Sequence, residues 1–174
     1  MIMNAEIAQD LVAQLMEVLT AEKALYEEML LKLNLKKKSI IEGDIKVMRA
    51  CMIDEQEIVK KLKEKQTEQT ELLSLIREKY SLHKNDLRLS KIIKMAPRQY
   101  TDQLIGLRIG LQTVMEKVTR INKDNRNLLN FSIEHVRGMI QLFLQANDEP
   151  TYLYNVRGNM TSAAKASRVL NFQV

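Results

Sequence analysis

The residues that most often carry enzyme chemistry are few in this chain and stand apart from one another. Its 174 residues include two histidines, His83 and His135, and a single cysteine, Cys51. The histidines have no metal-ligand partners at a suitable spacing, and the sequence holds no Gly-rich phosphate loop and no HExxH, CxxC or GxSxG motif. Without an activating histidine nearby, Cys51 is expected to be a packed thiol. These patterns predict a protein that is not an enzyme and uses no cofactor or metal.

His135 carries the one enzymatic alternative. It is followed by Arg137 and Gly138, which faintly resembles the motif of a histidine phosphotransfer domain. In that family the basic residue and the glycine stand third and fourth after the histidine, whereas here each comes one position earlier. Counting by 3.5 residues along the helix also places His135 at a core position. Phosphotransfer therefore stays the minor alternative.

The strongest pattern in the chain is a repeat of core-type residues from about Tyr100 to Ala146. Its steps alternate between four and three, which is the period of a helix packed along other helices. The positions are Tyr100, Leu104, Leu107, Leu111, Val114, Val118, Ile121, Asn125, Leu128, Ser132, His135, Met139, Leu142 and Ala146. At ~1.5 Å per residue this helix is roughly 70 Å long. Such a helix depends on packing for its stability, so we expect other helices alongside it.

Two further long helices precede it. A first helix is predicted from about Asn4 to Leu35 and a second from Ile45 to Tyr80, both with the same period. Gly43 and Asp44 predict the break between them, because glycine tolerates a left-handed backbone and aspartate caps the following helix. The lysine run 36–38 is expected to be a solvated turn at the end of the first helix.

A short amphipathic helix is predicted between the second and third long helices. Asp86 is its expected cap, and Pro97 disfavours a helical conformation at Ala96, so a boundary is expected there. The fold class is therefore all-α: an elongated antiparallel bundle or coiled coil of three long helices plus a short connecting helix, with a flexible C-terminal tail. Residues 1–148 are predicted to form the bundle, and residues 149–174 the tail.

Four residues stand out within the predicted helices. Glu22 falls on the core stripe and is expected to sit at its boundary with the carboxylate reaching solvent. Asn125 is at a core position, where asparagine usually fixes the register of neighbouring helices. Gly106 and Gly110 each cost about 1 kcal/mol against alanine. We expect them to allow close approach of a neighbouring helix, with a hinge as the alternative.

The end of the long helix and the tail differ from the rest of the chain. From Phe131 to Phe143 the apolar residues cover most of the helix circumference, which requires partners on several sides. Either the bundle surrounds this stretch, or a binding surface is left for another protein. The tail after Pro150 is small and polar in its middle and apolar at its end, so we expect it to be mobile when free and to order on a partner.

Composition narrows the compartment and the partners. The chain has 27 basic and 22 acidic residues, a balance of +5, but the two signs interleave as on solvated helix faces. We therefore expect no nucleic-acid partner. The single cysteine suggests a reducing compartment. No apolar run reaches transmembrane length and the N-terminus lacks a signal pattern, so the protein is expected to be soluble and cytoplasmic, without membrane insertion.

Several short motifs, in their order and spacing, resemble the FlgN family of flagellar export chaperones. The N-terminal part is similar in Glu22, Tyr26, Leu30, Leu33, Ile40, Ile41, Gly43, Asp44 and Glu55. The long helix is similar in Ile121, Asn122, Asn125, Leu128, Leu129 and Ser132, and the C-terminus in Tyr154, Asn155, Gly158, Ser167, Val169 and Leu170. The sequence departs from the family in its polar middle of the second helix, at Gln66 and Gln69, and in its many methionines.

The resemblance implies a cytoplasmic chaperone, not an enzyme, whose clients are the hook-associated (hook–filament junction) proteins. It keeps their terminal helices from premature assembly and delivers them to the export gate of the flagellar type III apparatus. One tyrosine of Tyr152 and Tyr154 is a candidate contact for that gate. A structural coiled-coil adaptor that dimerises through the long helix is the alternative; the sequence leaves the client and the oligomeric state open.

The predicted partner-binding residues lie in the last turns of the long helix and in the tail. They are Phe131, Val136, Ile140, Phe143, Tyr152, Leu153, Tyr154, Asn155, Val156, Arg157, Gly158, Val169, Leu170, Phe172 and Val174.

Overall fold

The computed structural model describes residues 7–83, 88–147, 152–154 and 160–162. Within them lie helices α1 (Gln9–Glu42), α2 (Ile45–Lys79), α3 (Leu89–Met95) and α4 (Arg98–Asn147), and strands β1 (Tyr152–Tyr154) and β2 (Met160–Ser162). The chain divides into two compact units, Met1–Leu129 and Asn130–Val174. The prediction of three long helices and a short connecting one is confirmed. Asp86, the predicted cap of α3, lies outside the described residues.

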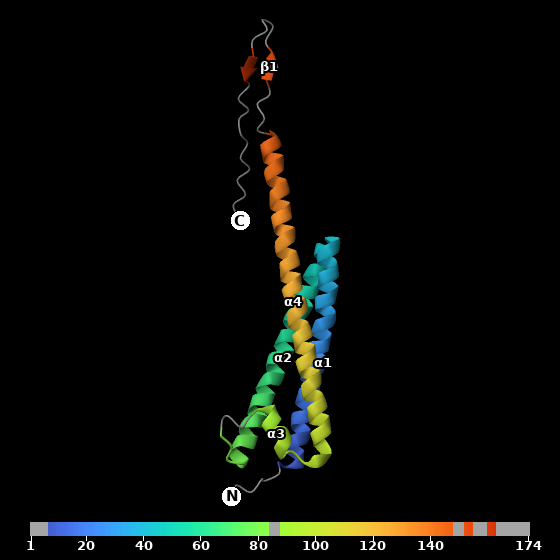
Figure 1. The fold of residues 1–174 in the computed structure, drawn as a ribbon, viewed down its shortest axis with the longest axis vertical. Helices are drawn as coiled ribbons and strands as arrows, with labels where there is room; N and C mark the ends of the chain where they lie inside the picture. The colour runs from blue at the N-terminus through green and yellow to red at the C-terminus, as the bar shows by residue number, and fades with distance from the viewer. Residues whose placement is uncertain (1–6, 84–87, 148–151, 155–159, 163–174) are drawn as a thin grey trace. The chain divides into compact units, whose positions relative to one another are not determined.

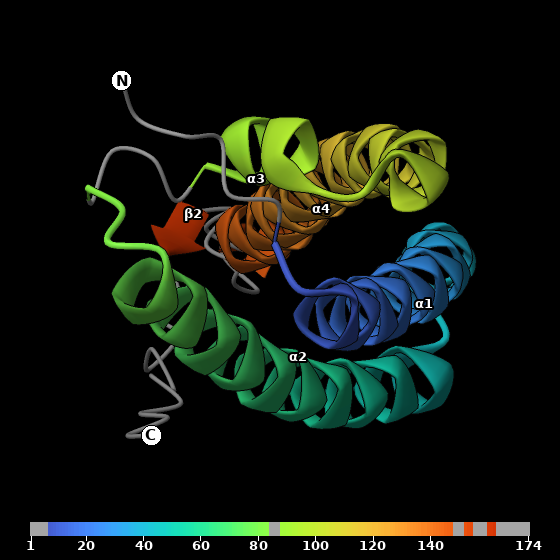
Figure 2. The same ribbon diagram turned by 90° about the horizontal axis from the view of Figure 1, so that it is seen from below.

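In the first unit, α1 and α2 form an antiparallel hairpin, and the part of α4 up to Leu129 runs beside α1 in the same direction (Figures 1 and 2). The larger hydrophobic core joins all four helices, and its buried members are Ile7, Leu11, Val12, Leu15, Leu19, Ile76, Ile92, Ile93, Ala96, Leu104 and Leu111. A smaller cluster between α1 and α2 contains Met29, Leu33, Ile58 and Leu62. The 3.5-residue period of each helix supplies these apolar faces.

Helix α3 closes the larger core at the end where α1 begins and α2 ends (Figure 2). Ile92 is fully buried and Ile93 nearly so, and the Ile7 amide donates to the Met95 carbonyl over 2.9 Å. Helix α1 has no side-chain cap of its own. Instead the Ala8 amide donates to the Tyr80 hydroxyl, 2.6 Å away. The end of α2 thereby satisfies a backbone donor at the start of α1.

The turn between α1 and α2 forms at the predicted residues. Gly43 has a left-handed φ of 72°, and the Asp44 amide donates to the Ser39 carbonyl over 2.9 Å. The Asp44 carboxylate accepts from the Val47 amide over 3.0 Å and caps α2. At the other predicted boundary, Ala96 is extended with ψ 150°, as the following proline requires.

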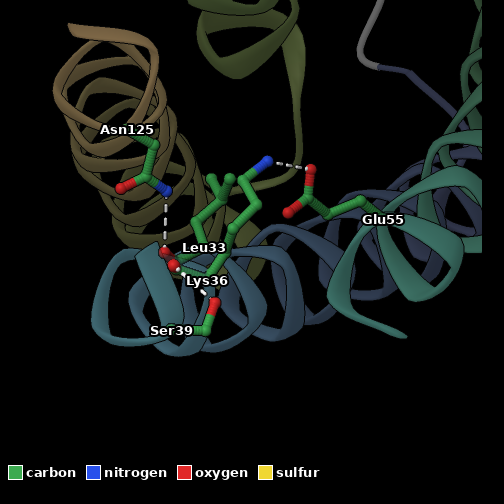
Figure 3. A network of polar contacts seen from close by, with 5 residues as sticks. All are labelled: Leu33, Lys36, Ser39, Glu55 and Asn125. Carbon is green, nitrogen blue, oxygen red and sulfur yellow. Dashed lines mark hydrogen bonds and ion pairs between the residues drawn. The ribbon is translucent and has the colours of Figure 1, made fainter. Parts of the chain in front are cut away.

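The predicted end of α1 at Leu35 is wrong, because the helix continues through the lysines to Glu42. Lys36 is buried, and its ammonium lies 2.6 Å from the Glu55 carboxylate of α2 (Figure 3). Lys37 lies 3.3 Å from Asp124 of α4. The expectation of a solvated turn is therefore wrong for these two lysines. Their charges are compensated across helix contacts, which a run of like charges in the sequence does not reveal.

Asn125 confirms the prediction that a core asparagine pairs with a neighbouring helix. It is buried, and its side-chain amide donates to the Leu33 carbonyl of α1 over 2.8 Å (Figure 3). The two glycines differ. A Cβ on Gly110 would come within 2.8 Å of the Lys23 side chain, whereas one on Gly106 would meet open space. The prediction that both glycines allow close approach is wrong for Gly106, and at Gly110 the neighbour is the end of a flexible lysine side chain.

Replacing Lys36 by methionine is expected to destabilise the fold by about 3 kcal/mol, because the Glu55 carboxylate, whose side chain is only 18% accessible, loses its cation. Urea denaturation followed by circular dichroism measures this difference. The double variant Lys36→Met/Glu55→Leu should recover most of the loss.

The matched control is Lys38→Met, which removes an exposed pair to Glu42 at 3.7 Å and should change stability by less than about 0.5 kcal/mol. Equal effects of Lys36→Met and Lys38→Met would show that the buried pair contributes nothing.

Candidate partner-binding surfaces

The helical part of the second unit presents an exposed apolar surface. Between residues 131 and 144 its large apolar side chains are all exposed: Phe131, Ile133, Val136, Met139, Ile140, Leu142, Phe143 and Leu144. Phe131 and Phe143 are the extremes, with 72% and 76% of their surface accessible. Single exposed apolar residues are common, but a contiguous group of this size usually marks a binding surface. The exposure favours the second of the two sequence-based alternatives.

Three core positions of the 3.5-residue count are wrong in this stretch. His135, Met139 and Leu142, predicted at the interface with other helices, are exposed. The His135 ring lies nearly parallel to that of Phe131, with centroids 6.4 Å apart. Because apolar residues surround the helix here, counting along one stripe does not tell which face, if any, is covered.

The predicted contact residues of α4 fall on two sides of the helix. Val136, Ile140 and Phe143 are spaced by four and three and share one face, which we call the terminal stripe. Phe131 is five residues before Val136 and lies on a different face, together with His135 and Leu142. The structure thus brings three of the four predicted helical residues together. Leu142 and Leu144 are exposed apolar neighbours that the predicted set omitted.

The described tail residues form two paired strands, which composition did not predict. β1 and β2 are antiparallel, with Tyr152 opposite Ser162 and Tyr154 opposite Met160. Tyr152, Leu153 and Tyr154 lie in β1. The other predicted contact residues lie outside the described residues: Asn155, Val156, Arg157, Gly158, Val169, Leu170, Phe172 and Val174.

The first unit contains a separate groove of about 740 Å³. Its floor comes from Leu19, Glu22 and Tyr26 of α1. Helix α2 contributes Gln66 and Gln69, and α3 contributes Leu89. The opposite wall is one continuous stripe of α4 with steps of three and one: Arg108, Leu111, Gln112, Met115, Glu116, Thr119, Arg120 and Lys123. The polar middle of α2, where the sequence departs from the family, therefore lines an open groove.

Glu22 overturns the expectation of a carboxylate that reaches solvent. Only 6% of the residue is accessible, and its Oε1 atom is fully buried with no hydrogen-bond partner among the described residues. Burial raises the pKa of Glu22, because the charged form loses hydration that nothing replaces. Buried carboxylate oxygens are nearly always paired. Glu22 lines the groove, but within the described ranges this oxygen of its carboxylate has no partner.

Cys51 is a packed core residue. Cys51 is buried, and burial is the main cause that raises the pKa of its thiol. The thiol therefore stays protonated and inert.

Among the described residues no group of histidine, cysteine and acidic side chains is arranged to hold a metal ion. The helices in that part of the chain include none with the length and apolarity to span a membrane.

An all-α bundle with an open groove and an exposed apolar helix surface has the architecture of a helical protein-binding module. The family model described as FlgN protein matches residues 1–162, so the chain belongs to the FlgN family, a family of flagellar export chaperones. No curated protein and no solved structure matches the chain.

Glu22→Gln is expected to stabilise the protein at pH 7 by about 1 kcal/mol, because it removes a buried, unpaired charge. A raised pKa in the folded state means that stability is complete below the ordinary pKa of glutamate and falls as the pH rises through the folded-state pKa. The advantage of the variant should therefore vanish near about pH 4.

Thermal unfolding of both proteins from pH 4 to pH 8 measures this, with a shift of roughly 2–4 °C expected at neutral pH. Glu17→Gln, at an exposed position on the same helix, is the control and should change little. A destabilised Glu22→Gln protein at pH 7 would contradict the account of the buried charge.

Proposed function

We propose that the chain is a cytoplasmic export chaperone that binds hook-associated flagellar proteins. It prevents their premature assembly and delivers them to the flagellar type III export apparatus. Membership in the FlgN family supports a role in flagellar export. The proposal goes further in naming the clients, the delivery step and the contact residues, which are the terminal stripe, Phe131 and the tail residues 152–158 and 169–174.

The exposure of the terminal stripe is the observation that carries this proposal. Val136, Ile140 and Phe143 are 48%, 54% and 76% accessible and repeat at the spacing of helix-in-groove contacts. A client's amphipathic helix laid along them removes apolar surface from water on both partners. Full burial of one such side chain contributes about 1.5–3 kcal/mol. The ordering of side chains and backbone offsets part of that gain, so binding is reversible.

Reversibility is what a delivery role requires. The client must leave the chaperone at the export apparatus, and no covalent step is needed for that. Met139 lies beside the terminal stripe and is exposed, and its unbranched side chain adapts to differently shaped partners. One of Tyr152 and Tyr154 in β1 is assigned to the export gate, so that client and gate contact neighbouring parts of the chain.

Ile140→Asp is expected to weaken binding of a hook-associated protein from the same bacterium at least tenfold, because it places a charge in the middle of the terminal stripe. Isothermal titration calorimetry with the purified client measures this. The side chain is exposed, so helicity and the thermal midpoint should stay nearly unchanged.

Leu31→Asp is the matched control, since Leu31 of α1 is 70% accessible but belongs to the first unit. It should leave client affinity unchanged. Unchanged affinity in Ile140→Asp, or equal losses in both variants, would overturn the assignment of the stripe.

Deletion of residues 150–174 tests the contribution of the tail. Loss of client binding with helicity and thermal midpoint nearly kept is expected. Unchanged affinity would exclude the tail from the client surface. Sedimentation of the same protein addresses the alternative role of a coiled-coil adaptor, which requires a stable dimer that survives the deletion.

A further inference from the structure

The groove of the first unit has three features of a binding site for a helix. It is long, it is apolar at its centre, and its lining residue Glu22 has a buried carboxylate oxygen that is unpaired among the residues the structure describes. It shares no residue with the terminal stripe or the tail. An inference from the groove therefore does not depend on the client surface proposed above.

The length of the groove indicates what shape of ligand fits. Its α4 wall extends from Arg108 to Lys123, which corresponds to ~22 Å of helix. Three long helices border or floor it, and a fourth helix of about 15 residues would cover the wall along its length. Packing of an added helix beside α2 and α4 would complete a four-helix arrangement, in which side chains of all the helices enclose one core.

The lining determines the chemistry of that helix. Leu111 is buried, but Met115 is 44% accessible and stands at the middle of the α4 wall. Leu19 and Tyr26 continue this apolar centre on α1. A ligand helix must therefore place an apolar face into the groove.

Charges at the rim select the flank of the ligand. Arg108, Arg120 and Lys123 line the groove and are exposed, against a single exposed carboxylate, that of Glu116. Glu116 accepts a hydrogen bond from the Gln112 amide over 3.0 Å. The α2 side contributes the neutral Gln66 and Gln69. The α4 edge is thus net basic and complements carboxylates on the partner.

The floor adds a requirement at one position. Only 6% of Glu22 is accessible, yet its Oε1 atom has no hydrogen-bond partner among the described residues. The Glu22 side chain lines the groove, and a rotation of this side chain would bring the covered oxygen to a side-chain amide on the ligand, which can donate to it. An apolar group opposite it would leave the oxygen as costly as it is now.

We propose that this groove is a second docking site, which takes an amphipathic helix of a partner protein that carries carboxylates along one edge and a side-chain amide in its apolar face. The amide pairs with Glu22, the apolar residues cover Met115 and Tyr26, and the carboxylates face the basic edge of α4.

A designed peptide tests the proposal with the full-length chain. The probe is a fluorescein-labelled 15-residue helix with leucines at positions i, i+3, i+4 and i+7, glutamates along one flank and one glutamine in the leucine face. A second peptide carries lysine in place of each glutamate, and a third carries leucine in place of the glutamine. Fluorescence anisotropy measures each affinity.

The acidic probe should bind, and the lysine peptide should bind roughly tenfold more weakly, because three rim cations each contribute a fraction of the binding free energy. Arg108→Glu/Arg120→Glu should reverse this order. Lys117→Glu is the control, since Lys117 is exposed on α4 but does not line the groove. Met115→Glu should abolish binding, and Ile140→Asp should leave it unchanged.

The contribution of Glu22 is tested by a double-mutant cycle. The glutamine probe should bind more tightly than the leucine peptide to the unaltered chain, by roughly tenfold for a hydrogen bond to a charged group. In Glu22→Leu the preference should disappear or reverse. Equal preference in both proteins would overturn the pairing of the amide with Glu22.

Three results would overturn the docking site itself. These are no binding of the acidic probe at millimolar concentration, equal binding of the acidic and lysine peptides, or unchanged binding to Met115→Glu. A dimer of the free chain that Met115→Glu converts to monomer would instead assign the groove to a second copy. Because Ile140→Asp reports on the client surface alone, failure of either proposal is visible separately.

Discussion

The burial of α1 against both α2 and α4 is the contact on which the first unit depends. Leu15 and Leu19 are almost fully buried, and the clusters that contain α1 residues also contain residues of each neighbouring helix. Helix α1 packs against α2 on one side and α4 on the other, so α2 and α4 each cover only part of their surface. The faces of α2 and α4 that α1 does not cover line the groove, and the polar middle of α2 lies on such a face.

The sequence predicts the parts of the fold that rest on periodicity and on backbone conformation. The 3.5-residue repeat identifies all three long helices, Gly43 and Asp44 identify the turn, and Pro97 identifies the start of α4. Asn125 is recognisable because a helix rarely places an amide at a core position without a partner. These signals are local, so one chain suffices to detect them.

The remaining features depend on residues that are distant in sequence. Lys36 is buried in α1 with its charge compensated by Glu55. No pattern in the sequence near Lys36 contains that information. The expectation for Glu22 is wrong for the opposite reason. A carboxylate on a core stripe usually finds solvent or a cation, whereas Glu22 is buried and its Oε1 has no hydrogen-bond partner in the part of the chain that the structure describes. The groove combines residues from α1 to α4. After residue 131 the 3.5-residue repeat does not predict which α4 residues are buried, because apolar residues there lie on every side of the helix.

The hydrogen bond from the Ala8 amide to the Tyr80 hydroxyl has a consequence for local opening. It joins the first turn of α1 to the end of α2, 72 residues away in the chain, at the end of the hairpin opposite Gly43. The Ile7 amide is tied to the end of α3 in the same region. If either helix end frays, the Ala8 amide at the start of α1 loses its acceptor, the Tyr80 hydroxyl at the end of α2. Amide hydrogens at these two ends and in α3 should therefore exchange with solvent through one shared opening event rather than independently.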